Sequence, residues 1–138
     1  MKKMFVNIYY LIVGILSILF SFTHALNGHQ TILKIIDLGN MDITSKSTIF
    51  YVWHIITIEN LIFGIAFISM AFYKNQSKIK FTAWLIALII VARWGVIFFS
   101  TLLKNTSGIP GTLMDSIAII VFVTLIILGT FKKDKVQF

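Results

Sequence analysis

The chain has 138 residues, of which 58% are hydrophobic and only 12% charged, and its mean hydropathy is +0.93. This composition excludes an ordinary soluble domain, which needs more polar side chains to cover its surface, and predicts a lipid-embedded protein. The absence of cysteine excludes disulfides and thiolate metal or redox sites. The net charge of +7 comes from lysines at the ends of apolar runs, a pattern that indicates membrane topology rather than nucleic-acid binding.

The first predicted span covers about residues 4–26 and is long enough to cross a bilayer. A cleavable signal peptide is the alternative, because Thr23-His24-Ala25 loosely resembles a small-x-small cleavage site. The apolar stretch is longer than a usual signal sequence, so we expect a retained helix. Steps of three and four along it give one face of small and polar residues, which we expect to face other helices: Asn7, Tyr10, Gly14, Ser17, Ser21, His24 and Gly28.

The longest connection, residues 27–48, contains the segment ILKIIDL. Ile32, Ile35 and Ile36 fall together on one face, which predicts a short amphipathic helix at the membrane interface rather than a free loop. It can act as a packing lid or as a substrate gate. Ser47 or Thr48 is the expected cap of the following helix.

Three further spans are predicted at about residues 49–73, 80–103 and 112–131. A short basic turn separates the first two, and Pro110 separates the last two. The positive-inside bias places both termini and the basic turn in the cytoplasm of a multi-pass cell-membrane protein. On that side lie Lys2, Lys3, Lys74, Lys78, Lys80, Lys132, Lys133 and Lys135, against Lys34, Lys46 and Lys104 on the other. The predicted fold is therefore all-α: a single transmembrane domain, an antiparallel bundle of four transmembrane helices with a short interfacial helix in the first loop.

Charged and polar residues inside these spans are the candidate functional groups, because such groups are costly in lipid. A rise of about 1.5 Å per residue puts Glu59 and Arg93 within roughly 3 Å of the membrane midplane, so we predict that they pair. The pair either fixes the register of two helices or takes part in binding an ion or polar substrate.

A second polar layer is predicted roughly 9 to 14 Å outward of the midplane, where His24, His54 and Asp115 fall on three helices. Together the two layers predict an outward-facing pocket that binds a small polar ligand or ion, or docks a membrane partner. Its predicted lining is His24, His54, Glu59, Asn60, Arg93 and Asp115.

We expect ordinary hydrogen-bonding roles for the histidines and no cofactor. One alternative is a haem held by His24 and His54; the other is zinc or iron held by His24, His54 and Asp115, with His29 as an additional ligand. Nucleotide-binding, Ser-His-Asp and nucleophile-elbow patterns are absent from the sequence, which favours a protein without enzyme activity over an enzyme. Trp53 and Trp84 fall near span ends, where tryptophan is an ordinary interfacial anchor.

With four spans, a long first outer loop and charges on the second and third helices, Glu59 and Arg93, the chain resembles the DoxX-like superfamily of small four-helix membrane proteins. The resemblance is one of architecture and implies a bacterial inner-membrane location beside a redox or transport partner. One functional alternative is a haem- or metal-binding membrane redox protein or enzyme. The others are a structural subunit in which the ion pair only specifies packing, and one protomer of a homo-oligomer.

Overall fold

A computed structural model describes residues 6–132 of the chain. Contacts between Cα atoms divide the chain into two units. The central unit is residues 14–68, and the terminal unit, built from both ends of the chain, is described at residues 6–13 and 69–132. Lys2, Lys3, Lys133 and Lys135, which the sequence analysis assigns to the cytoplasmic side, lie outside the described residues, as does the start of the first predicted span.

The described residues are almost entirely helical, and they include four helices long and apolar enough to cross a membrane. The elements in chain order are α1 (Ile8–Asn27), the π-helical turn η1 (Gly28–Ile32), α2 (Leu33–Leu38), α3 (Ile43–Ala71), α4 (Gln76–Lys104), the 3₁₀ turn η2 (Thr106–Gly108) and α5 (Ile109–Phe131). This confirms the predicted all-helical class and the four long apolar helices.

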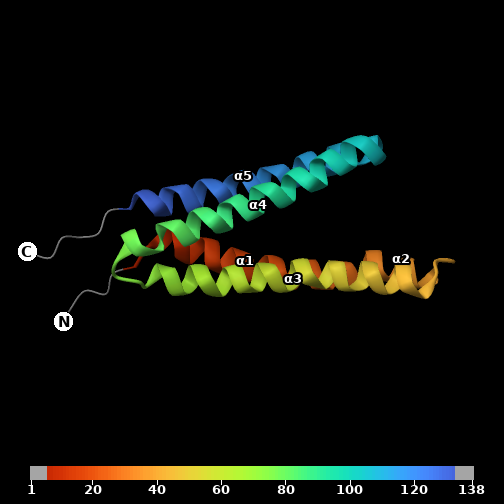
Figure 1. Ribbon diagram of the computed structural model, residues 1–138, viewed down its shortest axis with the longest axis horizontal. Coiled ribbons are helices and arrows are strands. Elements are labelled where there is room, and N and C mark those ends of the chain that lie inside the picture. Colours follow the sequence, from red (N-terminus) through yellow and green to blue (C-terminus); the bar gives the residue numbers. More distant parts are fainter. Residues whose placement is uncertain (1–5, 133–138) are drawn as a thin grey trace, which may run out of the picture. The chain divides into compact units, whose positions relative to one another are not determined.

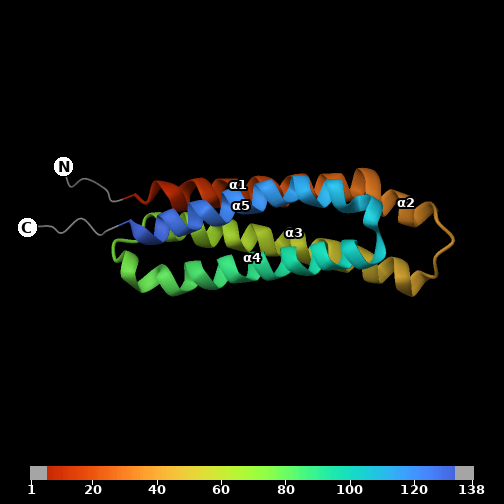
Figure 2. The same ribbon diagram turned by 90° about the horizontal axis from the view of Figure 1, so that it is seen from above.

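The segment ILKIIDL is helical, but no turn separates it from α1 (Figure 2). Asn27, Ile32 and Leu33 all have right-handed helical backbone angles, so α1, η1 and α2 form one continuous helix, Ile8–Leu38. Helix α3 likewise begins at Ile43, earlier than the expected start near residue 49. Its first turn is capped by Asp42, whose Oδ1 accepts a hydrogen bond from the Ser45 N–H at 2.9 Å; the expected caps, Ser47 and Thr48, lie within the helix.

In the central unit α1 and α3 run antiparallel, because residues further along α1 contact residues earlier in α3 (Figure 1). Gly14 and Gly64 lie where the two backbones are closest. A Cβ atom built on Gly14 would stand 2.8 Å from the Ile68 nitrogen and 2.9 Å from the Gly64 oxygen, so any larger residue would force the helices apart. About two turns further along the pair, the Ser21 hydroxyl donates a hydrogen bond of 2.8 Å to the Thr57 carbonyl.

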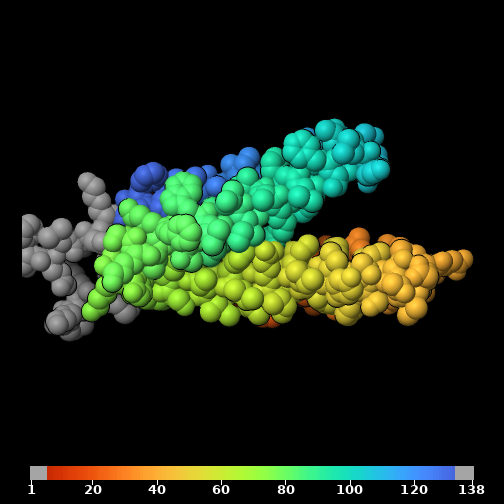
Figure 3. Space-filling model, viewed as in Figure 1, coloured from red at the N-terminus to blue at the C-terminus, as the bar shows by residue number. Residues whose placement is uncertain are grey.

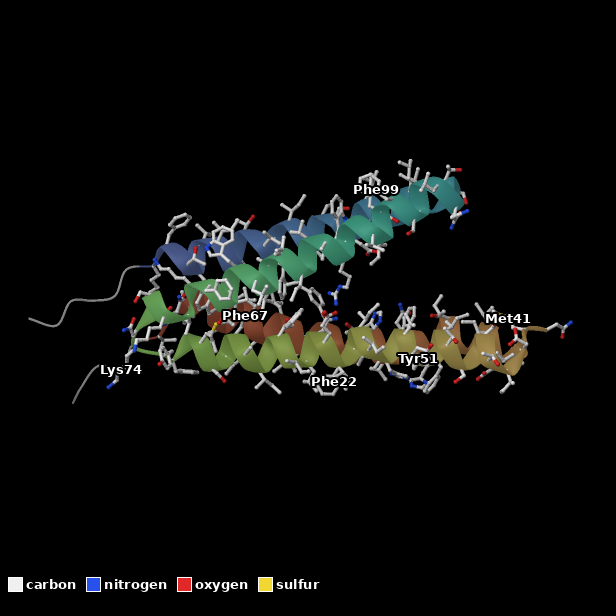
Figure 4. The ribbon with its side chains drawn as sticks, in the orientation of Figure 1. Phe22, Met41, Tyr51, Phe67, Lys74 and Phe99 are labelled. Carbon is white, nitrogen blue, oxygen red and sulfur yellow. The ribbon has the colours of Figure 1, made fainter. Side chains whose placement is uncertain are left out.

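The expected inward face of α1 is confirmed by burial: all but one of its residues are buried, and His24 is half-buried. Large apolar side chains occupy the other faces, as Phe22 on α1 and Phe99 on α4 illustrate (Figure 4). Phe22 is 61% exposed and Phe99 62% exposed. Helices α3 and α4, whose surfaces are seen in Figure 3, also carry many exposed large apolar side chains. Such an outer surface is suited to lipid rather than water.

The terminal unit pairs α4 with α5, again antiparallel (Figure 1). At one end a buried amide network joins three segments of the chain. The Asn7 Nδ2 group donates to Gln76 Oε1 at 2.7 Å and to the Gly129 carbonyl at 2.9 Å, while Lys132 Nζ donates to the Val6 carbonyl at 2.6 Å. Gln76, expected within a basic turn, is only 2% exposed and begins α4.

Candidate functional site

The candidate site lies in the central unit, at the end where α1 passes into η1 and packs against α3. Trp53 fixes the geometry there. Its indole Nε1 donates a hydrogen bond of 3.0 Å to the His24 carbonyl, and its ring stacks on the His24 imidazole with centroids 4.3 Å apart and planes 5° from parallel. Gly28 is buried against the same indole, which occupies the space that a side chain at position 28 would need.

The π-helical turn η1 changes the direction of the residues that follow Gly28. The Leu33 N–H bonds the Gly28 carbonyl, five residues back, instead of the carbonyl four residues back as in an α-helix. A π-turn therefore places one additional residue in the helix at the level where Gly28 rests on Trp53. His29, the next residue, reaches the side chains of α3 from this turn.

His29, His54 and Phe50 form a three-ring cluster at this end of the unit. The imidazoles of His29 and His54 have centroids 5.1 Å apart with an interplanar angle of 42°. Phe50 lies one turn before His54 on α3 and meets it edge-to-face at 4.5 Å, and it meets His29 edge-to-face at 6.1 Å. His54 is half-buried and His29 is exposed, so the cluster is open to its surroundings on the η1 side.

Glu59 and Asn60 lie further along α3, both half-buried. Arg93, also half-buried, belongs to α4, and Asp115, which is exposed, belongs to α5. The six predicted pocket residues are thus divided, with His24, His54, Glu59 and Asn60 in the central unit and the other two in the terminal unit. The Glu59–Arg93 ion pair and a pocket that includes all six residues stay predictions.

In the terminal unit a short chain of hydrogen bonds begins at Trp94, next to Arg93 in the sequence. The Trp94 Nε1 group donates a hydrogen bond of 2.8 Å to the hydroxyl of the buried Ser116, which in turn donates to the Thr112 carbonyl at 2.7 Å. The Trp94 ring also stacks on Phe98 with centroids 5.3 Å apart. These contacts join α4 to α5, and they give Trp94 a packing role.

The two cofactor alternatives can be compared with this geometry. The His24 imidazole stacks on the Trp53 indole, whereas the His54 imidazole lies tilted against His29 and edge-to-face against Phe50. Haem ligation by His24 and His54 stays a prediction. Within residues 6–132, no group of three or more His, Asp or Glu side chains is arranged to hold a metal. Asp115 belongs to the terminal unit and the two histidines to the central unit, so ligation of a metal by His24, His54 and Asp115 together remains a prediction.

Sequence reasoning missed the importance of Trp53 and Phe50, and it considered His29 only as an additional ligand in the metal alternative. Trp53 was expected to be an interfacial anchor, whereas it hydrogen-bonds a carbonyl 29 residues away in the sequence. The signal for the cluster was the four-residue spacing of Phe50 and His54, which puts both rings on one helical face. No pattern in the sequence predicted the π-turn that brings His29 to the rings of Phe50 and His54.

No protein-family model, no curated protein and no solved structure matches the chain. The resemblance to the DoxX-like superfamily accordingly stays a prediction.

Proposed function

We propose that the protein is a small multi-pass integral membrane protein that binds a small polar ligand or ion at the outer end of its central unit. The observation that carries the proposal is the His29–His54–Phe50 cluster, which gathers two imidazoles at the end of a helix pair that is otherwise largely apolar on its outer surface. Imidazoles near a membrane interface are suited to binding ions and polar groups, because they can donate or accept hydrogen bonds and coordinate metals.

Helix lengths support a spanning arrangement. The continuous helix Ile8–Leu38 has 31 residues and α3 has 29, which correspond to about 46 Å and 43 Å of helix against a hydrocarbon core of roughly 30 Å. Both helices are therefore long enough to extend into the outer interface. In this arrangement α2 is the interfacial helix, with Leu33 buried and Lys34 and Asp37 exposed.

The distribution of lysines supports the orientation, with both termini and the α3–α4 turn in the cytoplasm. Lys74 follows α3 in that turn and Met41 precedes α3 in the outer connection, at opposite ends of the helix (Figure 4). With this orientation, the His29–His54 cluster belongs to the outer interface.

Cysteine labelling tests the topology, because the natural chain has no cysteine. Asn40→Cys in the α2–α3 connection should react with a membrane-impermeant maleimide on intact cells. Ser77→Cys, exposed at the start of α4, should react only after permeabilisation. The reverse pattern, or equal labelling of both variants, would overturn the proposed orientation.

Thermal unfolding in detergent tests ligand binding. Sodium, potassium, ammonium, acetate and phosphate are used as separate probes, and a bound probe raises the Tm as its concentration rises above the Kd. We expect at least one probe to raise the Tm of the natural protein but not that of a His54→Leu variant. If no probe shifts the Tm, binding of simple ions at this end is contradicted while the membrane topology stands.

The Glu59–Arg93 pairing, proposed from the similar depth of the two residues in the sequence, has a separate test. Glu59→Arg and Arg93→Glu should each lower the yield of folded protein, and the double exchange should restore much of it if the two charges pair. Single variants that fold as well as the natural protein would contradict the pairing.

A further inference from the structure

We propose that His29 and His54 form a binding site for a divalent transition-metal ion such as Zn²⁺, Cu²⁺ or Ni²⁺. This inference deepens the proposed function and rests on it, since it names the class of ion that the outer end of the central unit takes. Imidazole is a preferred ligand for these metals, and the cysteine-free sequence offers no thiolate to compete with it.

The separation of the two rings is the first argument. A metal bound about 2.0–2.1 Å from an imidazole nitrogen lies roughly 3.2 Å from the ring centroid. Two such rings at a tetrahedral angle have centroids about 5 Å apart. The centroids of His29 and His54 are 5.1 Å apart. The rings therefore already have the spacing that a shared tetrahedral ion requires.

The position of each ring on a helix is the second argument. His54 lies within the long helix α3, where Phe50 packs edge-to-face against its ring. His29 lies in the π-helical turn, directly after Gly28, whose backbone rests on the Trp53 indole. Because helical elements hold both rings, little ordering is needed when an ion binds. Isolated π-turns occur frequently at functional sites, and here the turn is what brings His29 to α3.

The third argument is the number of protein ligands, which indicates whether a bound metal ion would be exchangeable or permanently held. Across residues 6–132 no third His, Asp or Glu completes a metal-binding group with this pair. Two coordination positions of a tetrahedral ion are then left for water or an added anion, which is typical of an exchangeable site rather than a closed structural one. The exposure of His29 gives an ion direct access to the pair.

Titration of the full-length protein in mild detergent, after removal of bound metal with a chelator, tests the site. The probes are Zn²⁺ and Cu²⁺ alone. We expect about one ion per chain by calorimetry, and nitrogen hyperfine coupling in the Cu²⁺ electron paramagnetic resonance spectrum. His29→Ala and His54→Ala should each lower the affinity at least about tenfold.

The matched control is Gln30→Ala, which changes the exposed residue directly after His29 in the same turn and leaves both imidazoles in place. It should bind Zn²⁺ with unchanged affinity. A loss equal to that of His29→Ala would overturn the assignment to His29 and His54, as would a natural protein that binds no ion or single variants that bind normally.

A gain of signal keeps the test independent of folding defects. His29 is exposed, so its replacement removes little packing. In His29→Cys, bound Co²⁺ should show a thiolate-to-metal charge-transfer band in the near ultraviolet that the natural protein lacks, because cysteine thiolate ligates such ions. Absence of this band in folded His29→Cys protein would contradict the site. If these metal tests fail while simple ions still raise the Tm, only the transition-metal inference falls.

Discussion

The central and terminal units hold their helices together by different means. In the central unit α1 and α3 approach until their backbones touch at Gly14 and Gly64. In the terminal unit the buried amides of Asn7 and Gln76 join three chain segments, and Trp94 bonds Ser116 across the α4–α5 pair. Lipid provides no hydrophobic force between helices, so close packing and hydrogen bonds are the two available solutions. The central unit adds the Ser21–Thr57 and Trp53–His24 bonds to its glycine crossing, whereas the terminal unit has a network of buried side-chain amides.

This difference indicates which polar groups are available for function. The amides of the terminal unit already bond to each other and to carbonyls, as a buried polar network must. In the central unit the glycine crossing does the packing, and its imidazoles lie towards one end against other rings. The more polar core is thus the more structural one, and the candidate site belongs to the unit with the glycine crossing.

The largest expected effect is on the glycine crossing. Gly64→Ala should destabilise the protein by about 2–3 kcal/mol, because its new Cβ would lie 2.9 Å from the Gly14 oxygen and the backbones must separate. Unfolding by a denaturing detergent measures the loss. Gly95→Ala is the matched control, since nothing lies within 4 Å of its Cβ position, and it should be neutral or stabilising by up to about 1 kcal/mol. Equal effects would refute the close crossing.

The amide network of the terminal unit should give the next largest effect. Gln76→Ala removes the acceptor of the 2.7 Å bond from Asn7 and leaves a buried amide hydrogen unsatisfied, which costs about 1–3 kcal/mol. Asn7→Ala should cost a similar amount, and the double variant less than the sum of the two. The same detergent titration measures all three, and strictly additive losses would show that the two amides do not act as a network.

Trp94 gives a smaller expected effect in the same unit. Trp94→Phe keeps an aromatic ring beside Phe98 but loses the 2.8 Å bond to Ser116, so it should cost roughly 0.5–1.5 kcal/mol. Trp84→Phe is the control, because Trp84 is 47% exposed. An equal response of the two variants in the unfolding titration would argue against the interhelical bond.

The smallest expected effect is at the first turn of α3, where hydrogen bonds from the Ser45 hydroxyl and N–H lower the pKa of Asp42. The stabilisation of the folded state by the ionised Asp42 carboxylate is therefore complete above the unfolded pKa of about 3.9. This stabilisation is lost as the pH falls through the lower pKa of the folded state. Hydrogen exchange in the first turn of α3 should accelerate over that acidic range. Asp42→Asn keeps a capping oxygen and should remove the pH dependence; a variant that retains it would assign the effect to another group.

Hydropathy and length were sufficient to predict the four helices, because a bilayer sets the length of apolar helix required. The inward face of α1 was predictable as well, since small and polar residues recur at helical spacing. The continuation of α1 through residues 28–38 was not. A separate helix was predicted over ILKIIDL, but residues 28–31 before it are glycine and polar side chains, and the contact that accompanies the π-turn is with Trp53, 25 positions after Gly28 in the sequence.

The candidate site was predictable in part. His54 was identified from its position within an apolar span, but its neighbours His29 and Phe50 depend on how α3 packs against η1, which composition does not reveal. Depth estimates grouped His24 with His54, whereas the structure stacks His24 on Trp53. The position of a residue along its helix gives its depth in the membrane, but it does not determine which of the side chains at that depth it contacts.

The bond between Lys132 and Val6 joins residues 126 positions apart and has a consequence for synthesis. The central unit, residues 14–68, has all its residues once α3 has emerged from the ribosome, but the terminal unit lacks its last helix until α5 follows. At 5–20 residues per second, the 64 residues from 68 to 132 take about 3–13 s. During that interval Asn7, the residue directly before α1, lacks its bond to the Gly129 carbonyl, because Gly129 has yet to be made.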